Sequence, residues 1–164
     1  MTKTEQNLMD AFAGESQANR KYLAYADKAE KEGFSQVAKL FRAAAHAETI
    51  HAHAHFRLAG NIHDTMANLK DAISGETHEF TSMYPGMIKE AEAEGNKAAA
   101  SYMKWVNAVE EIHANLYKKA LAADGKMDPV DYYVCTVCGY THEGPHDEPC
   151  PVCKAAAKAF EKVA

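Results

Sequence analysis

The feature that most constrains the fold of this chain is an internal repeat within its first 123 residues. Three short stretches recur after 61 or 62 residues: Gly14-Glu15-Ser16 as Gly75-Glu76-Thr77, Glu32-Gly33 as Glu94-Gly95, and Glu48-Thr49-Ile50-His51 as Glu110-Glu111-Ile112-His113. Three matches in nearly one register indicate two related helix hairpins packed about a pseudo-twofold axis. A site built from the repeated residues should therefore be nearly symmetric.

The repeated region has a composition typical of helices, because it is rich in Ala, Glu, Lys and Met and contains a single proline, Pro85. Apolar side chains recur at helical spacing. The predicted helices span residues 3–32, 34–60, 64–94 and 96–123. Glycines 33, 60 and 95 lie at three of the boundaries, where glycine readily adopts the left-handed C-cap conformation. Four helices joined by short turns predict a mainly α fold built on an antiparallel four-helix bundle.

Carboxylates lie on the apolar faces of these predicted helices. Glu48 and Glu110 each precede a histidine by three residues, His51 and His113, so each pair shares a helix face. Carboxylates that face a bundle core are costly unless they are paired, protonated or bound to cations. One Glu from each of two helices plus Glu-x-x-His from each of the other two is the pattern of a carboxylate-bridged pair of iron or manganese ions.

Glu79 departs from the repeat. Glu76 and Glu79 are separated by three residues, but the position equivalent to Glu79 in the first half is Ala18 or Gln17. The candidate ligands thus number seven: Glu15, Glu48, His51, Glu76, Glu79, Glu110 and His113. Seven ligands for two metals leave one to spare, and a spare ligand permits exchange at one ion. Such exchange is more typical of redox chemistry than of permanent structural binding.

The last forty residues differ in character, because they hold four of the five prolines and all four cysteines. We expect the bundle to occupy residues 1–125, a linker to cover about 125–131, and a small domain with short β-strands to occupy 126–164. Residues 155–163 are expected to form a short terminal helix. Two C-x-x-C pairs can hold one zinc or one iron in a tetrahedron of four thiolates: Cys135, Cys138, Cys150 and Cys153. Tyr133, Gly139-Tyr140 and Cys150-Pro151 favour iron.

Charge and motifs exclude several classes of function. The net charge of −5 offers no basic footprint for nucleic acid or an anionic membrane. No apolar run approaches the ~20 residues that a membrane span needs. The first residues lack the apolar core of a signal peptide, so a cytoplasmic location is expected. Without a strand followed by a glycine-rich fingerprint, no bound nucleotide is expected.

Taken together, these residues resemble the rubrerythrin family over essentially the whole chain. The matching stretches are Gly14-Glu15-Ser16-Gln17-Ala18, Glu48-x-x-His51, Gly75-Glu76-Thr77-x-Glu79-Phe80 followed by Met83-Tyr84-Pro85, Glu110-x-x-His113 and the four cysteines. The resemblance implies a ferritin-like di-iron four-helix bundle followed by a rubredoxin-like Fe(Cys)4 domain, without haem. The connection between the second and third helices is short for the family. It leaves the helix connectivity open, including exchange of hairpins between subunits.

The resemblance also implies a role for each ligand. Glu48 and Glu110 bridge two iron ions, with or without an oxo bridge. Glu15 and Glu79 serve one iron, whereas Glu76 and His113 serve the other. His51 replaces Glu79 when the centre is reduced. Two tyrosines, Tyr22 and Tyr84, orient the carboxylates.

The activity implied by the resemblance is that of a peroxidase of oxidative-stress defence, which reduces hydrogen peroxide to water. Electrons come from a reduced pyridine nucleotide through a separate reductase or rubredoxin, and then through the Fe(Cys)4 site. About ten helical residues after His113, roughly 15 Å, carry the chain to the end of the bundle. We therefore expect the two metal sites of one subunit to lie far apart, and we expect a homodimer. The resemblance implies that its subunits are arranged head to tail, which brings the Fe(Cys)4 site of one chain near the di-iron site of the other.

Two other classes of protein remain open from the sequence. The bundle alone is compatible with a ferritin-like iron-storage or ferroxidase protein, which needs a multi-subunit shell and no electron-delivery domain. The four cysteines alone are compatible with a structural zinc site in a non-catalytic module. Size in solution distinguishes the first from a peroxidase. Colour distinguishes the second, because ferric thiolate is red and zinc is colourless.

Overall fold

The computed structural model describes residues 2–163, which form two compact units divided between His63 and Asp64. The first unit is a helix hairpin, and the second is a helix hairpin followed by a small sheet. The prediction of a mainly helical chain with a small C-terminal β-structure is confirmed. No helix in the described part of the chain is long and apolar enough to cross a membrane.

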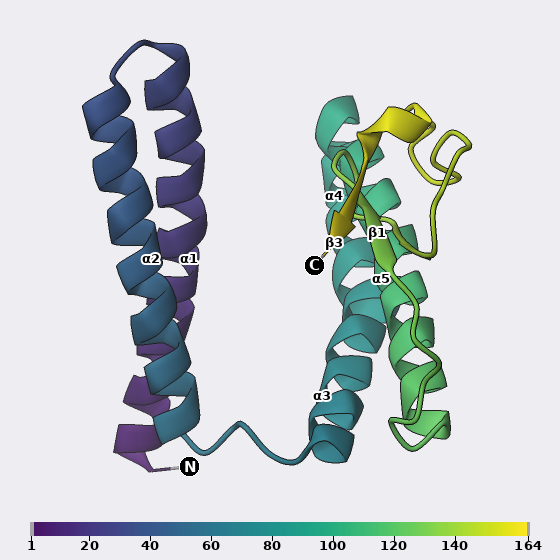
Figure 1. Cartoon of the computed structure of the whole chain (residues 1–164), viewed down its shortest axis with the longest axis horizontal. Helices are drawn as coiled ribbons and strands as arrows, with labels where there is room; N and C mark the ends of the chain where they lie inside the picture. The colour runs from purple at the N-terminus through teal and green to yellow at the C-terminus, as the bar shows by residue number, and fades with distance from the viewer. Residues whose placement is uncertain (1, 164) are drawn as a thin grey trace. The chain divides into compact units, whose positions relative to one another are not determined.

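The first unit consists of α1 (Lys3–Lys31) and α2 (Ser35–Leu58), which pack side by side as an antiparallel pair, here called hairpin 1 (Figure 1). Alanines fill its interface, among them Ala26, Ala38 and Ala45, and their small side chains let the two backbones approach closely. Asn19 is the buried polar residue of this interface. Its amide donates hydrogen bonds to the Ala45 carbonyl at 2.6 Å and to the Thr49 hydroxyl at 2.8 Å, which ties the two helices together.

The second unit begins with a helical arm made of α3 (Thr65–His78), a π-helical turn η1 (Glu79–Met83) and α4 (Tyr84–Ala93). This arm packs against α5 (Lys97–Ala122), and together they are called hairpin 2. The sequence predicted a single helix over 64–94, but the helix widens at η1, where the Tyr84 N–H donates to the Glu79 carbonyl. Pro85 explains the widening, because its ring clashes with the carbonyl four residues earlier and it has no N–H to donate.

The C-terminal segment 132–163, here called the cysteine module, contains a three-stranded antiparallel sheet of order β2-β1-β3. The strands are β1 (Tyr132–Cys135), β2 (Thr141–Glu143) and β3 (Phe160–Val163). The predicted terminal helix over 155–163 is wrong: a short 3₁₀ turn, Ala157–Ala159, leads into β3. Strand β3 pairs with β1 from Cys135↔Phe160 to Tyr132↔Val163, so the ladder with β1 overrides the local helix propensity of the alanines.

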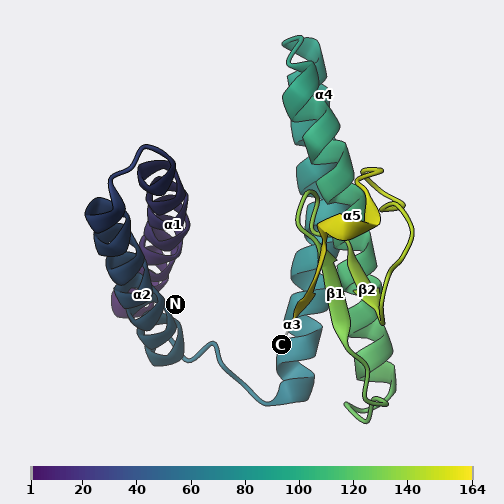
Figure 2. The same cartoon turned by 45° about the horizontal axis from the view of Figure 1, so that its top comes forward.

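The cysteine module packs on α5 of its own hairpin, as Figure 2 shows for β1 and β2. Val109 of α5 shares a buried core with Cys135, Cys138 and Cys150. The chain reverses at Gly125, whose φ of +72° lies in the left-handed region that glycine tolerates, and then returns along α5. The expectation that the chain would carry the cysteines far beyond the His113 region is therefore wrong, because it assumed that the chain continues past the end of the helix.

Candidate metal centres

Hairpin 1 brings together three of the predicted ligands, here called cluster 1: Glu15, Glu48 and His51. One ligand atom from each lies within 4.8 Å of the other two. The His51 Nδ1 lies 2.9 Å from the Glu48 Oε2, because residues three apart on a helix share a face. The two carboxylates are half-buried, whereas the His51 ring is exposed.

Hairpin 2 holds the equivalent group, here called cluster 2: Glu76, Glu110 and His113. The His113 Nδ1 lies 2.9 Å from the Glu110 Oε2 and 3.8 Å from the Glu76 Oε2. All three side chains are half-buried. The Glu-His distance matches that of cluster 1, so the sequence repeat appears in the structure as two copies of one three-residue arrangement.

The electrostatics of cluster 2 favour a bound cation. Burial, a hydrogen bond that the protonated Glu76 carboxyl donates to Glu110, and the negative charge of Glu110 raise the pKa of Glu76 from 4.5 to about 7. Two carboxylates crowded in a half-buried site repel one another unless a proton or a cation lies between them. Carboxylate oxygens with an imidazole nitrogen are a donor set suited to divalent iron or manganese. Cluster 2 therefore fits a metal ion.

The remaining predicted residues of the bundle lie near these clusters or beside aromatic rings. Glu79 is the first residue of η1 and belongs to neither three-residue cluster. Burial and the negative charges of Glu110, Glu79 and Glu76 raise the pKa of the Tyr84 phenol, which places this ring among the hairpin 2 carboxylates. The centroid of the Tyr22 ring lies 6.2 Å from the centroid of the Phe41 ring in the interface of hairpin 1.

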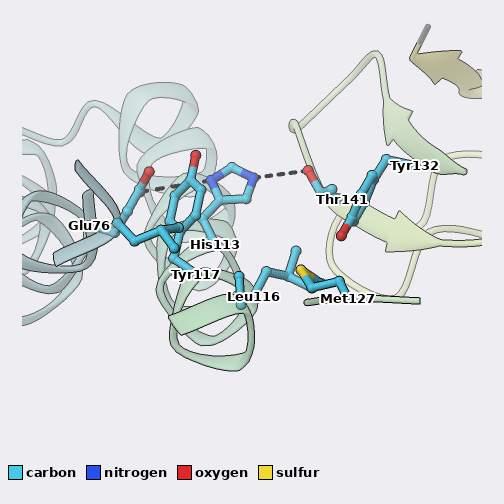
Figure 3. Close-up of a pocket in the computed structure, with 9 residues that line it drawn as sticks. Glu76, His113, Leu116, Tyr117, Met127, Tyr132 and Thr141 are labelled. Carbon is cyan, nitrogen blue, oxygen red and sulfur yellow. Dashed lines mark hydrogen bonds and ion pairs between the residues drawn. The ribbon is translucent and has the colours of Figure 1, made fainter. Parts of the chain in front are cut away.

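A residue that sequence reasoning missed is Thr141, the first residue of β2. The His113 Nε2 lies 3.0 Å from the Thr141 hydroxyl (Figure 3). That hydroxyl in turn donates to the Gly139 carbonyl at 3.2 Å. Because that hydroxyl has one proton, it accepts from the Nε2–H of His113. This tautomer leaves Nδ1 free to bind a metal. No local pattern could have identified Thr141, since the contact depends on how the cysteine module packs on α5.

A largely apolar pocket of about 490 Å³ opens beside this hydrogen bond (Figure 3). Its lining includes Glu76 and His113 of cluster 2 and the apolar side chains Leu69, Leu116 and Met127. Glu76 and His113 therefore face carboxylate groups on one side and this largely apolar pocket on the other. A small neutral molecule can approach them from the pocket side.

The four cysteines form the third candidate site, here called the thiolate site, and all are free thiols. The sulfur atoms of Cys135 and Cys153 lie 3.7 Å apart and those of Cys138 and Cys150 lie 3.6 Å apart. These distances are far above the ~2.05 Å of a disulfide bond. They are close to the edge of about 3.8 Å of a tetrahedron whose four sulfurs lie ~2.3 Å from a central ion. The arrangement fits a tetrahedral metal site with four sulfur ligands.

Backbone donors stabilise the thiolate form at one of these sulfurs. Burial alone would raise the pKa of the Cys135 thiol, but N–H groups of Val137 and Cys138 donate to its sulfur and hold the pKa below its usual value. At Cys138 and Cys153, burial prevails and raises the pKa of the thiols. Amide donors to metal-bound sulfur also tune the reduction potential of a thiolate-bound iron.

Comparisons with known proteins agree with this arrangement. The rubrerythrin family model matches residues 6–121, and the model of the rubrerythrin rubredoxin-like domain matches residues 133–161. Rubrerythrin-1 of Clostridium acetobutylicum is 36% identical over 183 aligned positions, which cover 98% of this chain and 94% of the relative. Nigerythrin of Nitratidesulfovibrio vulgaris is 36% identical over 92% of this chain and 81% of its own. A solved structure titled as the partially reduced state of nigerythrin matches with a TM-score of 0.60 and 32% identity, covering 99% of this chain and 88% of that one.

Proposed function

Since this chain belongs to the rubrerythrin family, whose di-iron bundle and rubredoxin-like Fe(Cys)4 domain it carries, we propose that it is a peroxidase that reduces hydrogen peroxide to water. The overall reaction takes two electrons and two protons per peroxide and yields two water molecules. One observation supports the proposal most strongly: the thiolate site packs directly against the helix that carries Glu110 and His113. A site for one-electron delivery thus adjoins half of a site for two metal ions.

Seven side chains would hold the two iron ions of the bundle: Glu15, Glu48, His51, Glu76, Glu79, Glu110 and His113. When bound, the two irons supply the two electrons that cleavage of the O–O bond requires, and the Fe(Cys)4 site returns them one at a time. The carboxylates balance the positive charge of the metals in a half-buried site. Glu79 and His51 are the exchangeable pair, and Tyr22 and Tyr84 orient the carboxylates.

The chain itself provides a short connection between the two kinds of site. Cys138 is followed by Gly139, whose carbonyl accepts a hydrogen bond from Thr141, and Thr141 accepts one from His113. His113 is held with its Nδ1 toward the carboxylates and its Nε2–H toward the cysteine module. We propose that electrons pass along this connection within one chain. A separate reductase or rubredoxin would reload the thiolate site, with a reduced pyridine nucleotide as the ultimate donor.

The test adds hydrogen peroxide to the anaerobically reduced, iron-loaded protein and follows the ferric-thiolate colour and the near-ultraviolet absorption of the di-iron site by stopped flow. We expect peroxide to oxidise both sites, the di-iron site first. Glu110→Ala should lose the di-iron site and its signal while it keeps the red colour of the thiolate site. If peroxide oxidises neither site faster than air does, the peroxidase proposal fails.

A further inference from the structure

The connection between the two hairpins is six residues long, because α2 ends at Leu58 and α3 begins at Thr65. Most of it belongs to the helix caps: Gly60 has a φ of +78°, and the Asn61 N–H donates back to the Phe56 carbonyl. Asp64 caps α3 by accepting from the Ala67 N–H at 2.8 Å. Even if it were fully extended, the path from Leu58 to Thr65 would span about 25 Å.

A ferritin-like bundle requires one connection that crosses the whole bundle. The connections within each hairpin are tight turns, so the crossing falls on residues 59–64, and α2 and α3 must run parallel. Glu48 lies ten residues before the end of α2, about 15 Å, and Glu76 lies eleven residues after the start of α3, about 16 Å. With both carboxylates at one level, the connection must cover about 31 Å along the bundle and about 10 Å across it. The available ~25 Å is too short.

The relatives carry internal residues that this chain lacks. The alignment to rubrerythrin-1 of Clostridium acetobutylicum runs over 183 positions, more than the 164 residues of this chain, although it covers nearly all of both proteins. Loss of a crossover segment predicts this kind of difference. A chain without that segment cannot bring its own two clusters together in the family's fold.

Within each hairpin, the helix faces that carry the clusters are not fully covered by the neighbouring helix of the same hairpin. Val37, Leu40 and Leu58 lie within about 80° of Glu48 around α2, at ~100° per residue. Their exposed fractions are 44%, 67% and 70%, which is unusual for large apolar side chains on the core face of a helix. On α5, Tyr102 and Tyr117 flank Glu110 and are 52% and 38% exposed. Both faces therefore need a partner surface of matching apolar and acidic character.

We propose that two copies of this chain exchange hairpins, so that hairpin 1 of one copy and hairpin 2 of the other complete each bundle. Each di-iron site then takes Glu15, Glu48 and His51 from one copy and Glu76, Glu79, Glu110 and His113 from the other. The proposal rests on the di-iron site proposed above. It also has a consequence for electron delivery: the thiolate site that serves each bundle belongs to the chain that supplies hairpin 2.

Complementation between two inactive variants tests the exchange. Glu48→Ala removes a ligand of cluster 1 and Glu110→Ala removes a ligand of cluster 2. The two variants, with different affinity tags, are co-expressed and purified over both tags to isolate mixed dimers. Ferrous iron is added anaerobically, and bound iron is counted after the Fe(Cys)4 content, known from its colour, has been subtracted.

Under exchange, one bundle of the mixed dimer contains both substitutions and the other contains neither. We expect the mixed dimer to bind one iron pair, half of the two pairs in the wild-type dimer, whereas each variant alone binds none. If each site forms within one chain, every site of the mixed dimer carries one substitution, and its iron content equals that of the variants alone. That result, or an iron pair bound by a monomer in light scattering, overturns the proposal.

A matched control lengthens the connection. Insertion of about 20 Gly and Ser residues after Gly60 gives a flexible segment long enough to cross the bundle. In variants lengthened in this way, complementation should disappear because each chain can close its own bundle. If complementation persists undiminished in the lengthened variants, the short connection is not what forces the exchange, and the argument from its length is overturned. The readout is bound iron and not turnover, so a wild-type dimer that holds two iron pairs yet ignores peroxide refutes the peroxidase and leaves the exchange standing.

Discussion

The hydroxyl of Thr141 joins the two metal-binding parts of hairpin 2, and its removal gives a sharp test of how His113 is held. Thr141→Val keeps the shape and the β-branch of the side chain but removes the acceptor that lies 3.0 Å from the His113 Nε2. The N–H of His113 then has no partner in a half-buried contact, and the imidazole is free to rotate or change tautomer.

The size of the effect follows from the role of such partners at metal sites. Loss of a hydrogen bond to the distal nitrogen of a metal-bound histidine typically costs 10- to 100-fold in metal affinity, or about 1.4–2.7 kcal/mol. The hydrogen bond from Thr141 to the Gly139 carbonyl is also lost, but the four sulfur atoms stay in place because Cys135, Cys138 and Cys150 remain buried. The effect should therefore fall on the bundle site and spare the thiolate site.

The assay is an anaerobic titration of ferrous iron against a chelator of known affinity, monitored separately for the bundle and for the colour of the thiolate site. Thr141→Val should lower the bundle affinity by roughly tenfold or more, with the spectrum of the thiolate site unchanged. Thr141→Ser restores the hydroxyl and should recover most of the affinity. If the affinity of Thr141→Val stays within about twofold of wild type, the hydroxyl does not orient His113 and the reasoning is refuted.

Three further predictions concern other parts of the molecule. Cys138→Ser should spare the first oxidation of the di-iron site by peroxide but block its re-reduction, as followed by double-mixing stopped flow. Full multiple turnover would contradict electron transfer through the thiolate site. Because the pKa of Glu76 is raised from 4.5 to about 7, the contribution of this carboxyl to the free energy of unfolding of the metal-free protein should be fully present below about pH 4.5 and fall by ~1 kcal/mol as the pH rises through 7. Glu76→Gln should flatten that part of the profile in urea titrations at several pH values, and an unchanged slope would show that Glu76 is not its source. Asn19→Ala removes two hydrogen bonds at a buried interface and should lower the free energy of unfolding by about 2 kcal/mol, whereas exposed Gln17→Ala should leave it nearly unchanged.

The repeat and the helical spacing were sufficient to predict two helix hairpins and to place ligand pairs such as Glu110 and His113 on one helix face, because such a pair depends on local helical spacing alone. They were not sufficient for features that depend on contacts between distant segments. Strand β3 (Phe160–Val163) follows an alanine-rich stretch and forms because β1 provides it with a hydrogen-bonding partner. The contact of Thr141 with His113 depends on the chain reversal at Gly125. The π-helical turn is an intermediate case. The sequence shows Pro85, but the predicted single helix over 64–94 did not include the wider turn that this proline causes.

The buried core shared by Val109 and three cysteines links the energetics of two parts of the chain that the sequence separates by composition. Metal binding by the thiolates stabilises the cysteine module, and through Val109 and the neighbouring Trp105 it also holds the middle of α5. Amide hydrogens in these turns of α5 should therefore exchange with solvent in step with those of the cysteine module, as one cooperative unit. Metal binding at the thiolate site would therefore order Glu110 and His113 before either of them binds a metal. The cysteine module would thus also prepare the metal-binding face of α5.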